Sequence, residues 1–220
     1  MLDKLEGWDK PEFIVEGSIK AQHRLLSGFH GTPNVNKKKL EEAYKPNQVA
    51  ISLIGEPTLY PMLDELIEEY KKRGFTTFVV SNGTNPEVIE KIEPYQLYLS
   101  LTAYSEESHL MLNKPSKNYW EDINKSLKIL SQKDGRTVLR LTLIKGYNME
   151  PEKYVKLIEK ASPTFIEAKA YMYLGYSRLR LPRTAMPEHE EIRAFSEKLS
   201  KLTGYEVKDE SPISRVVLLT

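Results

Sequence analysis

The stretch VAISLIGEPTLYP, residues 49–61, decides the fold. Its first six residues are mostly apolar and rich in β-branched side chains, which is typical of a buried strand. The run stops at Gly55-Glu56-Pro57, and Pro61 then opens an amphipathic segment, as proline often does at the start of a helix. A carboxylate therefore follows the C-terminal end of the strand, where open α/β sheets and βα barrels hold their ligands. An ordinary βα turn with a solvated glutamate explains so short a motif equally well.

Composition predicts one globular domain over residues 1–220, because the 220 residues are 40% hydrophobic and suffice for a sizeable core. The net charge of +1 gives no overall attraction for nucleic acid, so any basic site must be local. The chain has no cysteine, which excludes disulfides and thiolate-bound metals, and we expect no metal ligands. Neither a signal peptide nor a membrane-length apolar run occurs, which predicts a cytoplasmic protein with no membrane partner.

Hydrophobic periodicity divides the chain into N-terminal helices in residues 1–45 and a regular α/β part in residues 46–220. The predicted strands are 49–54, 75–81, 97–103, 137–145, 165–173 and 213–219, and the predicted helices are about 10–26, 37–44, 61–73, 86–92, 119–131, 151–160 and 188–202. Five βα units in series indicate right-handed crossovers and a parallel sheet.

Several predicted strands carry polar groups on one face. A strand covered by helices on both sides should be apolar throughout, whereas these alternate. The alternation predicts a sheet curled into a barrel or partial barrel, whose polar face encloses one shared cavity. Glu167 and Lys169 could instead pair with each other along one strand. The residues predicted to face the cavity are Ser100, Thr102, Arg140, Thr142, Glu167 and Lys169, and those predicted to contact helices are Leu99, Leu101, Leu139, Leu141, Ala168 and Ala170.

Two segments are locally basic. Between Ala168 and Thr184 there is no acidic residue, and Tyr176, Arg178 and Arg180 stand close together. Arginine binds phosphate and a planar ring stacks on an extruded base, so this combination suits an enzyme that acts on RNA. The alternative is a charged loop over the barrel mouth. Residues 17–40 also carry cations without an acid, and there we favour a solvated charged face.

Beyond these patterns, the order of several segments resembles the radical S-adenosylmethionine superfamily. Gly55-Glu56-Pro57 follows the first strand, Ser81-Asn82 follows the second, and a strand with Ser100 comes next. The likeness sharpens to the archaeal tRNA 4-demethylwyosine synthases, from WDKPEFIVEGSIKAQ near residue 8 almost to the C-terminus. It is carried by GEPTLYP, RGFTTFVVSNGTNPEV, QLYLSL, RLTLIKGYNM and KAYMYLGYSRLRL.

The resemblance implies a partial (β/α)6 barrel that binds S-adenosylmethionine. It implies cofactor contacts of three kinds: Gly55, Glu56 and Pro57 at the methionyl amino group, Ser81 and Asn82 near the carboxylate and ribose, and Ile144 and Asn148 on the adenine side. Ser100, on the third strand, is a further predicted cofactor-binding residue. The family is a group of lyases of tRNA modification, in wybutosine biosynthesis. They condense N1-methylguanine beside the anticodon with carbons of pyruvate, by a radical reaction. With the resemblance, we interpret Lys169, Arg140 and Glu167 as catalytic candidates and Tyr176, Arg178 and Arg180 as contacts to tRNA.

The chain departs from the family in one feature. Family members bind a 4Fe–4S cluster through a Cys-x3-Cys-x2-Cys motif that precedes the matched segments, whereas this chain has no cysteine. We therefore expect a fragment without the cluster and the first barrel strand, inactive alone, with strand 49–54 at the sheet edge. Two alternatives remain: a non-catalytic barrel module that binds S-adenosylmethionine or tRNA, and a different barrel enzyme with acid–base chemistry on Glu56, Glu167 and Lys169.

Overall fold

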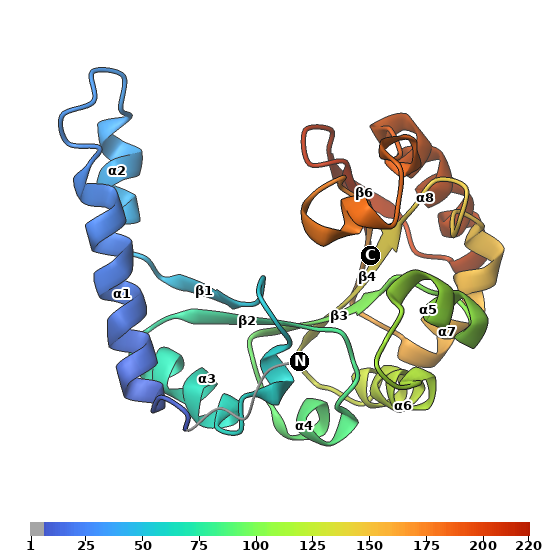
Figure 1. The fold of residues 1–220 in the computed structure, drawn as a ribbon, viewed down its shortest axis with the longest axis horizontal. Helices are drawn as coiled ribbons and strands as arrows, with labels where there is room; N and C mark the ends of the chain where they lie inside the picture. Colours follow the sequence, from blue (N-terminus) through green and yellow to red (C-terminus); the bar gives the residue numbers. More distant parts are fainter. Residues whose placement is uncertain (1–6) are drawn as a thin grey trace.

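A computed structural model describes residues 7–220 as a curved seven-stranded sheet with helices on its convex face (Figure 1). The strand order is β1-β2-β3-β4-β5-β7-β6, with β1 to β5 parallel and β7 antiparallel to both β5 and β6. The strands are β1 Gln48–Ile51, β2 Thr76–Ser81, β3 Gln96–Leu101, β4 Arg136–Leu143, β5 Phe165–Ala170, β6 Val207–Ser211 and β7 Val216–Leu219. No pairing joins β6 to β1 among the described residues, so the barrel is partial, as predicted.

Eight α-helices and four short 3-10 helices accompany the strands in the described part of the chain. The α-helices are α1 Pro11–Ser27, α2 Lys37–Ala43, α3 Leu63–Lys72, α4 Pro86–Lys91, α5 Glu106–Asn113, α6 Trp120–Leu130, α7 Val155–Ala161 and α8 His189–Thr203. The 3-10 helices are η1 Pro57–Leu59, η2 Pro151–Tyr154, η3 Gly175–Leu179 and η4 Arg183–Ala185. Within residues 7–220, no helix has both the length and the apolar character needed to cross a membrane.

The core lies between the convex face of the sheet and the helices. The six residues predicted to contact helices are all at most 2% exposed and belong to one hydrophobic cluster. That cluster includes Ile123 and Leu127 from α6 and Ile192 from α8. Alternation along each strand therefore places these side chains as the sequence predicts. The six are Leu99, Leu101, Leu139, Leu141, Ala168 and Ala170.

The concave face is polar and half-buried. The strand register aligns Ser100, Arg140 and Glu167 across β3, β4 and β5. Arg140 Nε donates a hydrogen bond of 2.7 Å to Glu167 Oε2, and its guanidinium carbon lies 4.5 Å from the centre of the Tyr98 ring. The expected alternative of a Glu167–Lys169 pair is therefore wrong. Within residues 7–220, Lys169 has no acidic partner at ion-pair distance.

Element boundaries differ from prediction where apolar residues are exposed. β1 ends at Ile51, since Leu53 turns the chain with a φ of 88°, and Leu53 and Ile54 are 94% and 93% exposed. The predicted strand 49–54 was therefore too long, and α3 begins at Leu63 rather than at 61. β5 likewise ends at Ala170 instead of 173, and α5 and β6 were not predicted.

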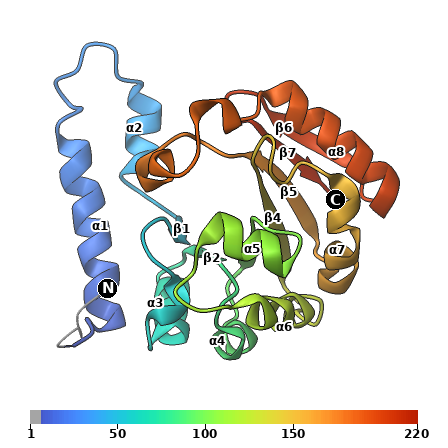
Figure 2. The ribbon, with the colours of Figure 1, turned by 45° about the vertical axis from the view of Figure 1, so that its right-hand side comes forward.

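β1 is an edge strand, as predicted, because it pairs only with β2. Helix α1 packs beside it through Val15, which is fully buried with Leu66 and Tyr70 of α3. Val49 and Ile51 pack against this hydrophobic cluster, whereas Gln48 and Ala50 remain exposed, so only one face of β1 is covered. Figure 2, turned by 45°, shows α1 and α2 as an antiparallel pair at the β1 side of the sheet.

Candidate cofactor site at the ends of the first three strands

The loop after β1 presents Glu56 to the end of β2. Gly55 has a φ of 77°, which glycine adopts without strain, and Glu56 caps η1. Glu56 Oε1 accepts hydrogen bonds from Thr58 N (3.2 Å), Thr58 Oγ1 (2.8 Å) and Ser81 Oγ (2.7 Å), and Oε2 accepts one from Asn82 N at 2.8 Å. These bonds bring Glu56, Ser81 and Asn82 together at the C-terminal rim, as expected from strands that end side by side.

The loop after β2 is fixed by its own side chains. Ser81 Oγ accepts a hydrogen bond from Gly83 N at 3.0 Å, and Asn82 Oδ1 accepts from Thr84 N and Thr84 Oγ1 at 3.0 and 2.7 Å. Ser126 of α6 donates to the Gly83 carbonyl at 2.7 Å, and a Cβ on Gly83 would lie 3.5 Å from the Ser126 Cβ. The 3.5 Å spacing is an ordinary packing contact, so it is the φ of 75° that favours a glycine at this position.

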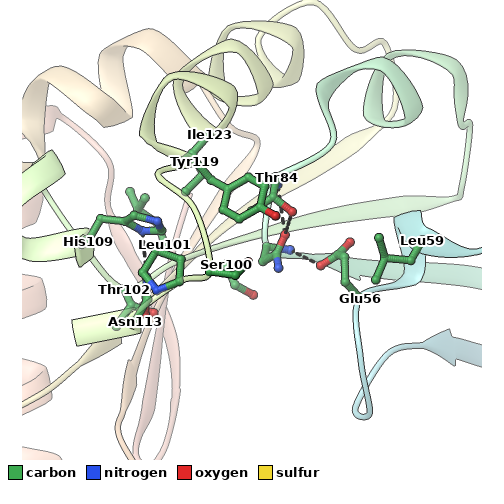
Figure 3. Close-up of a pocket in the computed structure, with 14 residues that line it drawn as sticks. Glu56, Leu59, Thr84, Ser100, Leu101, Thr102, His109, Asn113, Tyr119 and Ile123 are labelled. Carbon is green, nitrogen blue, oxygen red and sulfur yellow. Dashed lines mark hydrogen bonds between the residues drawn. The ribbon is translucent and has the colours of Figure 1, made fainter. Parts of the chain in front are cut away.

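A cavity of about 460 Å³ lies beside Glu56, above the ends of β2 and β3. Figure 3 shows Glu56 and Leu59 at one end, His109 and Asn113 at the other, and Ser100 between them. The lining residues are Glu56, Leu59, Asn82, Thr84, Ser100, Leu101, Thr102, Ala103, His109, Asn113, Pro115, Ser116, Tyr119 and Ile123.

The prediction of a single cavity for all six polar strand residues is wrong. Ser100 and Thr102 line this cavity, but the polar residues of β4 and β5 do not. Helix α5 and the loop that leads to α6 form the wall above β3, so the space closes there. The four residues outside it are Arg140, Thr142, Glu167 and Lys169, which belong to the polar face of β4 and β5.

His109 is the titratable residue of this wall that sequence reasoning missed. Only 4% of its surface is exposed, and burial lowers the pKa of the imidazole, which favours the neutral ring. Its Nδ1 lies 2.9 Å from Asn113 Nδ2, whereas its Nε2 is buried without a hydrogen-bond partner among the described residues. No motif marks His109, because the segment that forms α5 has no strong hydrophobic period.

Ile144 and Asn148, predicted on the adenine side, are both buried. Asn148 Oδ1 accepts from Ile144 N at 2.5 Å, and Nδ2 donates to the carbonyls of Thr102 and Thr142 at 2.6 and 2.8 Å. The Asn148 amide thus ties the ends of β3 and β4 together. Both of its polar atoms are bonded within the protein, and neither Ile144 nor Asn148 lines the cavity beside Glu56.

The basic loop after β5 exposes one tyrosine and two arginines in and directly after η3. Tyr176 is 86% exposed on η3, and Arg178 and Arg180 are exposed as well. Arg180 Nη1 donates to the carbonyls of Leu112 at 3.2 Å and Asn113 at 3.4 Å, which attaches the loop to the end of α5. The two arginines therefore differ, because Arg180 partly serves the fold.

The residues of this chain do not fit a 4Fe–4S cluster. There is no cysteine, and within residues 7–220 no group of three or more His, Cys, Asp or Glu side chains could hold a metal ion. Biological iron–sulfur clusters are held mainly by thiolates, and the four histidines of this chain do not replace them.

Comparison with known sequences defines the class first. The sequence model described as "Radical SAM superfamily" matches residues 21–158, more than half of the chain, and the model described as "Wyosine base formation" matches residues 160–220. The five parallel strands β1 to β5 agree with the first match. In fold and sequence, the chain is a radical S-adenosylmethionine protein.

Within this class, relatives with one activity match nearly the whole chain. The S-adenosyl-L-methionine-dependent tRNA 4-demethylwyosine synthase of Pyrococcus abyssi is 54% identical, with 96% of this chain and 64% of the relative covered. The synthase of Methanocaldococcus jannaschii is 48% identical, with 96% and 68% covered. The chain belongs to the tRNA 4-demethylwyosine synthase family, and it spans about two thirds of the length of these relatives.

A solved structure supports the same assignment. The chain superposes with a TM-score of 0.92 on TYW1 with a lysine-pyruvate adduct bound, at 46% identity, and the match covers 99% of this chain and 71% of the other. The architecture described above is therefore that of the corresponding part of a synthase of this family.

Proposed function

We propose that this chain is the part of a tRNA 4-demethylwyosine synthase that binds S-adenosylmethionine and faces the tRNA. The Glu56 carboxylate carries the proposal. It is fixed at the C-terminal rim by four hydrogen bonds and stands at one end of a cavity of about 460 Å³. A fixed carboxylate is complementary to the ammonium group of a methionyl moiety, and charge-assisted hydrogen bonds are the stronger kind.

The other candidate cofactor residues have separate roles in this proposal. Gly55 and Pro57 set the turn that presents Glu56, while Ser81 holds its carboxylate. Asn82 and Ser100 offer polar groups to the cavity. Ile144 and Asn148 shape the wall on the adenine side, since their polar atoms are used within the protein. In this superfamily, the bound cofactor supplies a 5′-deoxyadenosyl radical.

The substrate side of the proposal uses the concave face. The ammonium group of Lys169 has no acidic partner in the described part of the chain, so it is available to the carboxylate of pyruvate. Arg140 and Glu167 neutralise each other beside it. We assign them the role of holding this face in shape for the reaction.

The tRNA side uses the loop after β5. Tyr176 and Arg178 project from η3 with mostly exposed side chains, as stacking on a base and contact with phosphate require. Arg180 adds charge while it anchors the loop. We propose that the whole protein, of which this chain is a part, is a cytoplasmic lyase that modifies tRNA.

One observation favours a second candidate. Because the chain holds no cysteine, it cannot ligate the cluster itself, so a non-catalytic module that binds the cofactor or tRNA is the alternative. The two candidates differ in whether these residues support turnover once a cluster is supplied by a complete synthase.

A chimera tests the proposal. This chain would replace the aligned part of the Pyrococcus abyssi synthase, with which it is 54% identical. We expect the reconstituted chimera to form 4-demethylwyosine in tRNA, and expect Lys169→Ala and Glu56→Gln chimeras to lose most of that activity. A folded, cluster-loaded chimera that binds S-adenosylmethionine but forms no product would instead support the non-catalytic module.

A further inference from the structure

The end of the cavity opposite Glu56 contains an unsatisfied hydrogen-bonding group. Figure 3 shows His109 and Asn113 at this end, with Tyr119 and Ser100 between them and Glu56. His109 is 4% exposed, yet its Nε2 has no partner among the described residues. Buried polar groups are nearly always paired, so one that borders a cavity points to a partner held there.

The hydrogen bond to Asn113 defines which imidazole nitrogen carries the proton. The Asn113 side-chain nitrogen, 2.9 Å from His109 Nδ1, has protons to donate but no lone pair to accept. Nδ1 must therefore accept, and Nε2 of the neutral ring carries the hydrogen. The unsatisfied group is thus a donor, whose partner must be an acceptor.

We propose that His109 Nε2 donates a hydrogen bond to an oxygen acceptor of the ligand that fills this cavity. His109 would then be a ligand-binding residue at the end opposite Glu56. The inference rests on the proposed cofactor site, and it deepens that site. A ligand with an ammonium group at one end and a ribose hydroxyl at the other fits the two ends, whereas an amino-acid carboxylate shares a carbon with its ammonium group and stays near Glu56.

Packing alone does not account for this side chain. The Trp120 ring lies beside His109 at 6.0 Å between ring centres and a tilt of 38°, which is an aromatic contact that phenylalanine could make as well. The nitrogen is buried in the free chain, so contact with a ligand requires the His109 ring or a neighbouring side chain to move. Tyr119 lines the same cavity, so its signals should respond to the ligand together with those of His109.

The test uses nitrogen-15 nuclear magnetic resonance of the histidine side chains in the full chain. The chain has four histidines, and loss of a signal in His109→Gln assigns the His109 resonances. The free chain should show His109 protonated on Nε2, and protonation on Nδ1 would overturn the proposal. S-adenosylmethionine, methionine, 5′-methylthioadenosine and pyruvate are then titrated separately.

We expect S-adenosylmethionine to shift the His109 Nε2–H signal. A shift with 5′-methylthioadenosine assigns the acceptor to the ribose, and a shift with methionine in its place would overturn the assignment of the ammonium group to Glu56 and of the ribose to His109. If S-adenosylmethionine shifts the backbone amides of Asn82 and Ser100 but leaves His109 unchanged, the His109 proposal fails and the cofactor site stands. If it shifts none of them, both proposals fail for this chain.

Two variants separate the donor from the shape of the side chain. His109→Gln keeps an N–H near the position of Nε2, and His109→Asn keeps one only near Nδ1. We expect the dissociation constant for S-adenosylmethionine to rise about tenfold in His109→Asn and less than about threefold in His109→Gln. The exposed His30 provides the control His30→Gln, which should bind as the unmodified chain does. Equal affinities for both His109 variants, with unfolding curves like the control, would contradict the proposal.

Discussion

The Ser81 hydroxyl donates a hydrogen bond of 2.7 Å to Glu56 Oε1, so the last residue of β2 fixes the carboxylate that follows β1. The two residues are 25 positions apart in sequence, and the parallel pairing of β1 with β2 brings them together. Ser81 is 1% exposed, whereas Glu56 is half-buried and borders the cavity, so the donor of this contact is buried and the acceptor is not. The orientation of the proposed ammonium-binding group thus depends on a buried serine.

Replacement of Ser81 by Ala should lower stability. The substitution removes one of three hydrogen bonds to Glu56 Oε1, and we expect the free energy of unfolding to fall by about 1 kcal/mol. Urea denaturation measures the change, and Glu90→Gln, at an exposed carboxylate, serves as the control. Equal midpoints for Ser81→Ala and the control would show that this bond does not stabilise the fold.

The Arg140–Glu167 pair should show a positive coupling energy. Their side chains are only 25% and 17% exposed, so removal of one partner leaves a poorly solvated charge. We expect Arg140→Gln alone to destabilise by about 1–3 kcal/mol, and the double variant with Glu167→Gln to recover part of that loss. A double-mutant cycle by urea denaturation measures the coupling. Simple additivity of the two substitutions would refute it.

The buried Asn148 should matter more for folding than any exposed asparagine. Asn148→Ala leaves Ile144 N–H and the carbonyls of Thr102 and Thr142 without their present partner. We expect a loss of about 3 kcal/mol or more in the free energy of unfolding. The exposed Asn34→Ala is the matched control, with a loss of less than about 0.5 kcal/mol. A similar small loss in both variants would contradict the structural role.

Substitutions of Arg178 and Arg180 should have different effects on tRNA binding. Arg178→Ala should reduce the slope of log affinity against log salt by about one unit, because one phosphate contact is lost. Arg180→Ala should also loosen the loop, since Arg180 bonds to the end of α5. Filter binding across a salt series measures both, with Arg193→Ala on α8 as the control. An unchanged slope in Arg178→Ala would leave that residue without a phosphate contact.

The sequence predicted the regular part of the fold because the parallel strands are buried and rich in β-branched or leucine residues. The predicted strand 49–54 was too long at its C-terminal end, because Leu53 and Ile54 are apolar but exposed. β6 was missed because residues 207–211, VKDES, show no apolar alternation, and their pairing with β7 makes the strand. Tertiary pairing overrode local preference there.

Part of the candidate site could likewise be predicted from the sequence, and part could not. Glu56, Ser81 and Asn82 could be predicted to meet, because each follows or ends a neighbouring parallel strand. His109 could not, since only the folded chain shows that Nε2 lacks a partner beside a cavity. The ion-pair partner of Glu167 could not be predicted either. Lys169 lies two residues along the same strand and Arg140 is the register partner on β4, and only side-chain geometry selects Arg140.

Titration calorimetry of S-adenosylmethionine into the chain and its Glu56→Gln variant tests the central claim most directly. We predict weak, saturable binding to the unmodified chain, because the chain has no thiolates to hold the cluster that chelates the methionyl group in the family. In Glu56→Gln the affinity should fall at least about tenfold, since a charge-assisted hydrogen bond is lost. Binding as tight as in a cluster-loaded relative would refute the prediction of weak binding. Equal affinities for the two proteins would contradict the assignment of Glu56 as the ammonium-binding residue.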